Sequence, residues 1–334
     1  MARCAQRIAI PTSLQGWLSR MLQFTATLFA GFIAIAAIFG LINWCQKAST
    51  GDKAAVMGLY LLWGMPGVLM FIAGLALAVN GRGEGAPVLG IGLGLSLPLL
   101  RPFRQLVARY TPMDPDSPID YSGLAIVLAL LGFLIPTVFV DSEPATSTAS
   151  GTEDLINGVL QQLVAYLMIA YVAVGYRNYR TGAEATARLG IQKPTNVQII
   201  AGLAGTGAAF VAAYLGSALT SWLQPDSAAG IDSVVQSMVA GVSSGIVALI
   251  LALATGIGEE VLFRGAIQPR FGIVITALLF TFLHAQYGFT WILLGLFLMG
   301  CVFGYIAKRY GTMSAVIAHT LYNLAIVILQ VWIL

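Results

Sequence analysis

The chain has 334 residues, of which 58% are apolar and only 9% are charged. Soluble globular proteins carry about 25% charged residues, so the composition excludes a water-soluble enzyme. The mean hydropathy of +0.85 also excludes a disordered chain, because disorder requires high charge and low hydrophobicity. The net charge of +3, with no long basic run, provides no nucleic-acid-binding surface. The composition therefore predicts an integral membrane protein in contact with membrane lipid.

The apolar runs predict the fold class. A spanning helix needs about 20 mostly apolar residues, and runs without two-residue alternation favour helices over a barrel. We therefore expect an all-α, polytopic transmembrane helix bundle with about 9–10 spanning helices. The predicted helices, the third of them short and glycine-rich, are Met21–Trp44, Ala54–Val79, Ala86–Leu100, Tyr121–Val140, Leu155–Tyr176, Val197–Leu219, Ser237–Gln268, Ile273–Ala285, Trp291–Ala307 and Met313–Leu334.

The first apolar run has two interpretations. It follows three arginines, Arg3, Arg7 and Arg20, as the apolar region of a signal peptide would. The run is longer than the ~7–15 apolar residues of a signal peptide, and no clean cleavage site follows it. We therefore expect a retained helix, in a multi-pass protein of a bacterial inner membrane.

The loop charges predict an orientation. Cytoplasmic loops are enriched in Lys and Arg, whereas the loop Asp141–Asp154 is acidic and has no basic residue. We therefore expect Asp141–Asp154 outside and four basic segments inside, namely Arg101–Arg109, Arg177–Lys193, Gln268–Gly272 and Lys308–Gly311. If three helices precede Arg101, the basic N-terminus lies outside, which conflicts with the enrichment of Lys and Arg on the cytoplasmic side. Either Ala86–Leu100 is re-entrant, or this enrichment fails at one end of the chain.

Ionisable residues within the apolar helices mark a candidate site. From Ser233 to the end of the chain the only acidic residues are Glu259 and Glu260, and the only two histidines of the chain, His284 and His319, lie in the same segment. A charge at bilayer depth costs about 2.5–3.5 kcal/mol on insertion scales, so such residues are functional candidates. The alternative interpretation places the two glutamates at a helix end in the headgroup region.

The spacing of these residues favours a shared depth. A turn at Pro269–Gly272 would form a hairpin, with Glu259 and His284 at similar distances on either side of it. Both would then lie roughly 13–17 Å from the turn. His319 lies roughly 12 Å beyond the next turn, and Asn323 is four residues further on the same helix face. Three helices are thus predicted to bring these side chains to one level.

The spacing also predicts different roles for the two glutamates. Arg264 follows Glu260 by four residues, so the two side chains share a helix face and can form an ion pair. Glu259 is rotated by about 100° from Glu260 and is left free to face the histidines. An arginine that extends its charged end to the membrane surface is the alternative for Arg264.

Three chemistries suit a glutamate, two histidines and an asparagine. A buried carboxylate beside a histidine can act as a general base on water, while His and Asn stabilise the oxyanion. A zinc ion held by Glu259, His284 and His319 is the second, although no HExxH motif is present. A proton relay in a transporter is the third. No serine or cysteine lies in a nucleophile motif, and the three cysteines are far apart.

Three motifs together resemble the CPBP family, which includes type II CAAX prenyl endopeptidases and bacterial relatives linked to bacteriocin immunity. They are Glu259-Glu260-x-x-x-Arg264, Phe280-x-x-x-His284 and His319-x-x-x-Asn323, on successive apolar helices. The resemblance covers about residues 185–330, and residues 1–180 resemble no family that we can name. We therefore expect N-terminal transmembrane helices of unknown role over residues 1–180 and a CPBP-like catalytic bundle over residues 185–334.

The resemblance implies an intramembrane endopeptidase of the glutamate type, acting on a peptide or a membrane-associated or lipidated protein. By motif position, Glu259 and His284 would hold and activate water, and His319 and Asn323 would form the oxyanion site. Glu260 and Arg264 would brace the first motif. No cofactor is expected, with zinc as the alternative. A noncatalytic adaptor or immunity protein and a transporter are the competing functions.

Overall fold

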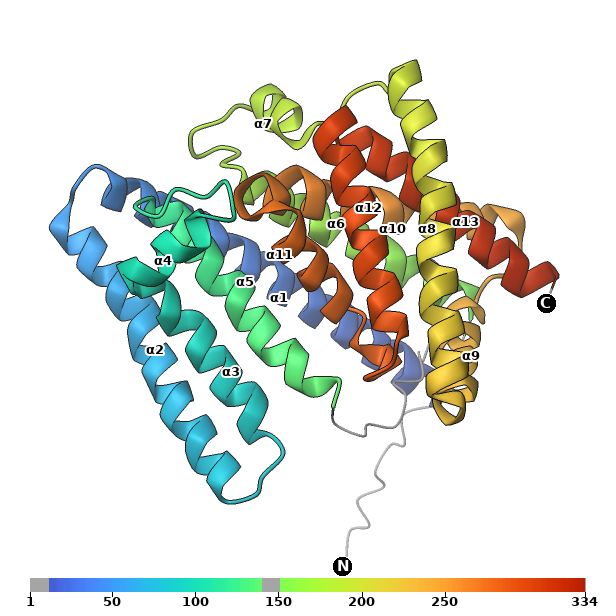
Figure 1. The fold of residues 1–334 in the computed structure, drawn as a ribbon, viewed down its shortest axis with the longest axis horizontal. Coiled ribbons are helices and arrows are strands. Elements are labelled where there is room, and N and C mark those ends of the chain that lie inside the picture. The colour runs from blue at the N-terminus through green and yellow to red at the C-terminus, as the bar shows by residue number, and fades with distance from the viewer. Residues whose placement is uncertain (1–11, 140–150, 334) are drawn as a thin grey trace, which may run out of the picture.

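The computed structural model describes residues 12–139 and 151–333. In this part of the chain the regular elements are helices, and no β-strand is formed, which confirms the predicted all-α class. Figure 1 shows the helices as one bundle. In chain order the elements are α1 (Thr12–Ser49), α2 (Lys53–Val79), α3 (Gly85–Ser96), η1 (Leu97–Leu99), α4 (Arg101–Ala108), α5 (Pro118–Thr137), α6 (Thr152–Ala173), α7 (Gly182–Leu189), α8 (Asn196–Leu223), α9 (Pro225–Val239), α10 (Gly245–Glu260), η2 (Val261–Ile267), α11 (Gln268–Phe282), η3 (Ala285–Tyr287), α12 (Ile292–Tyr310) and α13 (Thr312–Trp332).

The protein is an integral, multi-pass membrane protein by the length and apolar character of its helices. Within the described residues, eight helices are long and apolar enough to cross a membrane, or nine if α3 and α4 form one broken span. The count lies at the lower edge of the 9–10 expected from sequence. One reason is that the stretch 245–282, predicted as parts of two spans, counts as one helical stretch although Gly272 breaks it.

The helices α2, α3 and α5 pack together at one edge of the bundle (Figure 1). Gly90 and Gly94 of α3 face Gly132 and Ala129 of α5 so closely that a methyl group on either glycine would overlap the α5 backbone. This confirms the close helix packing that paired small residues indicate. At its carboxyl end α3 leads through η1 into α4, which is bent from it by 88°.

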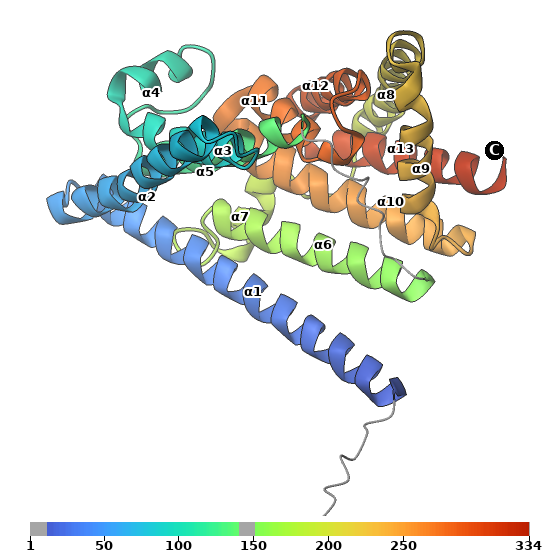
Figure 2. The ribbon, with the colours of Figure 1, turned by 90° about the horizontal axis from the view of Figure 1, so that it is seen from below.

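The helix α6 separates α1 from the C-terminal helices. Figure 2 shows α1, α6 and α10 as successive layers, and α6 contacts both of its neighbours. On its far side α10 packs against α13, while α12 packs against α8, α11 and α13. The residues of α10 therefore lie between a helix from the N-terminal half of the chain and a helix at its C-terminal end.

The chain reverses at Gly272, as predicted for the turn at Pro269–Gly272. Gly272 has φ 76° and ψ 177°, which glycine adopts at little cost. Phe263, nine residues before Gly272, and Phe280, eight residues after it, have ring centroids 5.8 Å apart. The two legs of this hairpin thus place equidistant residues side by side. The expected single helix Ser237–Gln268 is wrong, because residues 240–244 interrupt it between α9 and α10 and its last turns are the π-helix η2.

The basic segments predicted to share a membrane side lie at one end of the bundle. Three close approaches connect these segments with residues adjacent to another of them: Gly272 with Pro112, Arg188 with the carbonyl oxygen of Gly265, and Gly190 with Thr312. At the opposite end, Thr152 at the start of α6 hydrogen-bonds Ser243 just before α10. The structure places these segments at one end, and which side of the membrane they face stays a prediction.

The fold does not resolve which side of the membrane the N-terminus lies on. Three helices still precede Arg101, and α1 starts at the end opposite the basic segments (Figure 2). The helix α3 runs back along α2 and turns aside only at its end. Arg3, Arg7 and most of the acidic loop Asp141–Asp154 lie outside the described residues.

Candidate functional site

Glu259 and Glu260 are the last two residues of α10, and both side chains are buried. The next seven residues, Val261–Ile267, form a π-helix. Such wide turns are rare and occur frequently at functional sites. The first motif therefore lies at the junction of two helix types, deep between α6 and α13.

Glu260 makes its two side-chain hydrogen bonds through one oxygen, Oε1, and its Oε2 is buried without a hydrogen-bond partner among the described residues. Its Oε1 accepts a hydrogen bond from Nη1 of Arg264 at 2.9 Å and another from Nδ1 of His319 at 2.8 Å. The Arg264 and Glu260 side chains are 0% exposed and His319 is 6% exposed. The Glu260–Arg264 pair predicted from the four-residue spacing is confirmed. We call these three residues the Glu260 cluster.

Aromatic rings and a carbonyl group surround the guanidinium of Arg264. Its carbon lies 4.9 Å from the ring centroid of Phe280, 5.6 Å from that of Phe303 and 5.8 Å from that of Phe263. Its Nη2 donates to the carbonyl oxygen of Gly300 at 3.2 Å. Ring faces carry partial negative charge and attract cations. Arg264 is therefore a fixed charge within the protein and does not extend to the membrane surface.

Glu259 has a different environment from Glu260. Its Oε1 accepts a hydrogen bond from Nε2 of Gln162, on α6, at 3.2 Å. Its Oε2 is buried and has no hydrogen-bond partner among the described residues. A buried carboxylate oxygen without a partner is costly. The two glutamates thus differ at Oε1, which accepts from a neutral amide in Glu259 and from Arg264 and His319 in Glu260, while Oε2 of each lacks a partner among the described residues.

His284 lies just beyond the end of α11, and its ring is oriented by the backbone. Its Nδ1 is 2.8 Å from the carbonyl oxygen of Phe280. Since a carbonyl oxygen only accepts hydrogen bonds, Nδ1 carries the proton and Nε2 has a free lone pair in the neutral ring. The Phe280 ring contacts both His284 and His319, at centroid distances of 4.8 Å and 5.9 Å.

Asn323 is held beside the Glu259 face of α10. Its Nδ2 donates to Oγ1 of Thr255 at 2.9 Å. Thr255 precedes Glu259 by one turn and Asn323 follows His319 by one turn, on helices that run antiparallel. Asn323 therefore lies about one helical turn along α10 from Glu259.

The sequence missed Gln162 and Thr255, the two polar side chains that orient Glu259 and Asn323. Gln162 is an amide in an apolar helix, which is a signal of a buried partner. Its neighbour Gln161 gives the same signal, so the sequence did not distinguish the two. Thr255 gives none, because threonine commonly bonds to its own helix backbone, as it also does here to Leu251.

The zinc set considered from sequence does not fit this arrangement. Among the residues that the structure describes, no three His, Cys, Asp or Glu side chains are grouped so that they could hold a metal ion. His319 directs Nδ1 to Glu260, and His284 directs Nδ1 to a carbonyl oxygen. Both rings keep Nε2 free, so these contacts do not themselves exclude a metal ligand, and the misfit rests on the absence of a grouped set of side chains within the described residues.

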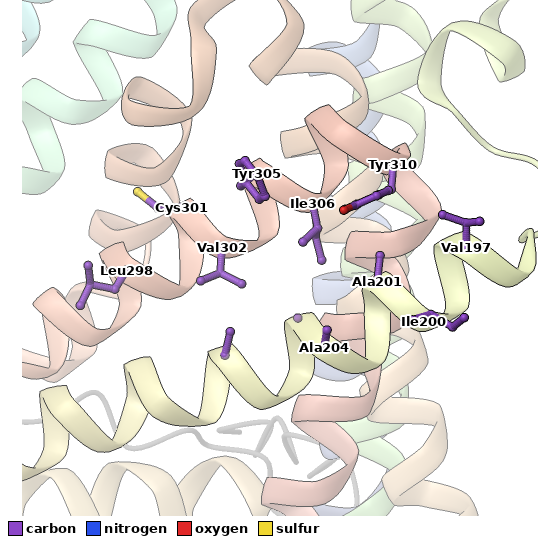
Figure 3. A pocket seen from close by; sticks show the side chains of 12 residues that line it. Val197, Ile200, Ala201, Ala204, Leu298, Cys301, Val302, Tyr305, Ile306 and Tyr310 are labelled. Carbon is purple, nitrogen blue, oxygen red and sulfur yellow. The ribbon is translucent and has the colours of Figure 1, made fainter.

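An apolar cavity of about 730 Å³ lies between α8 and α12, on the far side of α12 from Glu259. Figure 3 shows Val302 and Ile306 of α12 pointing towards α8, which contributes Ala201 and Ala204, while Leu298 and Cys301 of α12 also line the cavity. None of the six motif residues lines this cavity. Its walls are mostly apolar, and the only ionisable groups among the described residues that line it are the phenols of Tyr305 and Tyr310 and the free thiol of Cys301. The buried polar cluster, which holds the motif residues, is therefore the better candidate for the site.

The comparisons with known proteins match part of the chain. Residues 241–325 match the family model described as type II CAAX prenyl endopeptidase Rce1-like. The match spans α10 to α13 and includes all six motif residues. It confirms, over this segment, the resemblance to the CPBP family that the three motifs indicate. A search of curated proteins and a search of solved structures found no match.

Proposed function

We propose that the protein is an intramembrane endopeptidase in which Glu259 activates water to hydrolyse a peptide bond. The match to the CAAX-type family supports an intramembrane protease in general. The observation that carries the mechanism is the contrast between the two glutamates. Oε1 of Glu260 is held by Arg264 and His319, whereas Oε1 of Glu259 accepts from the neutral amide of Gln162. In both carboxyl groups Oε2 is buried with no hydrogen-bond partner among the described residues, but only Glu259 is without a cation that holds its charge.

In the proposed reaction, Oε2 of Glu259 takes a proton from a water molecule as the water oxygen attacks the substrate carbonyl carbon. Nε2 of His284, free in the neutral ring, accepts the second hydrogen bond of that water. The carbonyl oxygen becomes an oxyanion. When the C–N bond breaks, Glu259 returns its proton to the leaving nitrogen, and the products are a carboxylic acid and an amine.

His319 and Asn323 are proposed to stabilise the oxyanion. The Nδ2 of Asn323 uses one hydrogen on Thr255 and has a second to donate. His319 gives Nδ1–H to Glu260 and turns Nε2 away from it. As an imidazolium it also donates from Nε2, and the carboxylate of Glu260, shared with Arg264, lies against its Nδ1–H. Glu260 and Arg264 therefore act on the reaction by fixing the His319 ring.

We propose that no metal ion takes part, because each catalytic side chain has a role as acid, base or hydrogen-bond donor. The substrate is proposed to be a membrane-associated or lipidated peptide or protein, since the reacting groups are buried among membrane helices. A bacterial inner membrane is the proposed location. The competing noncatalytic adaptor would retain the fold and bind a partner without cleaving it.

The test is a pair of peptide assays on the purified full chain in liposomes. The probes are a fluorogenic farnesylated peptide with a C-terminal CAAX sequence and the same peptide without the lipid. Membranes from cells that express the wild-type chain or Glu259→Gln are also compared for new protein N-termini. We expect N-termini that require Glu259, and cleavage of at least one probe. No Glu259-dependent cleavage in either experiment would favour the adaptor.

A further inference from the structure

We propose that Gln162 of α6 is a positioning residue for Glu259, so that the N-terminal half of the chain completes the catalytic site. This inference rests on the proposed function. Gln162 lies outside the segment that matches the family and outside the predicted catalytic bundle. Its Nε2 nevertheless donates to Oε1 of Glu259 at 3.2 Å, across 97 positions of sequence.

The face of α6 that carries Gln162 is built into the site. Leu163 and Tyr166 lie against Gly258, the residue that precedes Glu259. The ring of Tyr166 meets that of Phe263 edge to face, with centroids 6.4 Å apart. Ala170, two turns beyond Leu163, is fully buried in the same hydrophobic cluster as Val261 and Leu262. The backbone of α6 is thus fixed against the whole Glu259–Phe263 stretch, and Gln162 has a defined position.

The chemistry of an amide suits the proposed role. A glutamine has N–H donors and no charge, so it can hold a carboxylate without neutralising it. Its hydrogen bond to Oε1 fixes the rotation of the Glu259 carboxyl group and leaves Oε2 as the oxygen that takes the proton. Arginine or lysine in its place would form an ion pair with the base. Catalytic groups need such support, because small displacements cost large factors in rate.

A purely structural role is the competing interpretation, in which Gln162 only satisfies a buried acceptor. The two interpretations predict different effects when Gln162 is substituted. A structural role predicts a less stable protein with an unaltered turnover number per folded molecule. A positioning role predicts a lower kcat with an unchanged KM, because Gln162 acts on the base and not on the substrate.

The first arm of the test measures the contact without any substrate. Infrared spectra of the full chain in liposomes are compared with those of Glu259→Gln, and the carboxyl band lost in that variant is assigned to Glu259. We expect this band to move in Gln162→Met, which keeps the length of the side chain but removes the donor. It should stay in place in Gln161→Met, the same substitution at a half-buried neighbour that has no hydrogen bond within the described residues.

The second arm measures kinetics with the farnesylated CAAX peptide. A hydrogen bond to a charged group contributes enough for kcat to fall about tenfold to a hundredfold in Gln162→Met, with KM unchanged. Gln162→Glu places a second carboxyl group beside that of Glu259, and its kcat should fall at least as far. Gln161→Met should match the wild-type protein. Melting temperatures in detergent, measured for all variants, identify a loss that comes from unfolding.

The outcomes separate this inference from the proposed function. An unmoved Glu259 band, or a wild-type kcat in Gln162→Met while Glu259→Gln is inactive, would overturn the role of Gln162 alone. A fully active Glu259→Gln would overturn the proposed mechanism. A Gln162→Met protein that melts early but keeps its kcat would assign Gln162 a structural role.

Discussion

Two adjacent glutamates, Glu259 and Glu260, have the same chemistry and opposite surroundings. Glu260 lies in an ion pair and hydrogen bond with Arg264 and His319, both from the segment that matches the family. Glu259 has one neutral donor, Gln162, which comes from outside that segment. Each carboxyl group has a second oxygen, Oε2, with no partner among the described residues. In the proposed mechanism the first arrangement holds a charge in place, whereas the second leaves a carboxylate without a cation and free to take a proton.

The difference follows from helix geometry. A rotation of about 100° between consecutive residues turns Glu260 towards α13 and Glu259 towards α6. The sequence motif therefore places one carboxylate on each side of α10. A brace and a base can then lie next to each other in sequence without competing for the same partners. The predictions below test this division, beginning with the largest expected effect.

The first prediction concerns His284, which is proposed to hold the attacking water together with Glu259. We expect His284→Gln to lower kcat by about 10²- to 10⁴-fold, the usual contribution of a positioned acid or base. The melting temperature in detergent should change little, because within the described residues the half-buried ring hydrogen-bonds to the carbonyl group of Phe280 alone. Cleavage of the farnesylated peptide measures the rate. A wild-type rate in this variant would show that His284 does not hold the attacking water.

The second prediction concerns the brace. Arg264→Met should destabilise the protein by about 3–5 kcal/mol, since it leaves the Glu260 carboxylate buried and without its cation. The matched control is Arg309→Met, which removes an exposed arginine and should cost less than about 0.5 kcal/mol. Thermal melting in detergent compares the two variants. Equal melting temperatures would show that the Glu260 cluster does not stabilise the fold.

The third prediction tests the contact that aligns the two motifs. Gly256 packs directly on the backbone of Thr320, so a methyl group there would force α10 and α13 apart. Gly256→Ala should cost about 1–3 kcal/mol through overpacking. Gly207→Ala on α8, where a methyl group meets no atom within 4 Å, is the control and should be neutral or slightly stabilising. The same melting assay compares them, and a stable Gly256→Ala would show that the helices can separate freely.

The fourth prediction is an absence of effect. Because Glu259, His284 and His319 have roles that need no metal, incubation with a zinc chelator should leave kcat unchanged. The purified protein should hold far less than one zinc ion per chain by elemental analysis. Loss of activity with the chelator, restored by added zinc, would instead support the metal-dependent alternative and would require the three side chains to rearrange.

Several features were predictable because they depend on local periodicity. Apolar run length predicted the helical class, and the four-residue spacing predicted the Glu260–Arg264 pair. The proline and glycine of the segment Pro269–Gly272 predicted the reversal of the chain at Gly272. Each of these follows from a rule that acts over one or two turns of helix. For that reason they required no knowledge of how distant helices pack.

The contacts between distant helices could not be predicted. Nothing in the spacing indicates that His319 bonds Glu260, or that Gln162 rather than Gln161 faces Glu259. Both depend on the rotation of a whole helix against its neighbour, which the sum of many apolar contacts determines. The break at residues 240–244 was missed for a related reason: the segment stays apolar, so its hydropathy does not mark the end of α9.

The central claim is that Glu259 is the base and Glu260 is the brace. Its most direct test measures kcat and melting temperature for Glu259→Gln and Glu260→Gln, in the same liposomes and detergent. We predict that Glu259→Gln is inactive but melts near the wild-type temperature, while Glu260→Gln melts much earlier and has reduced activity. If Glu259→Gln melts early while Glu260→Gln is stable and inactive, the two roles are reversed. If Glu259→Gln retains full activity, the mechanism is wrong.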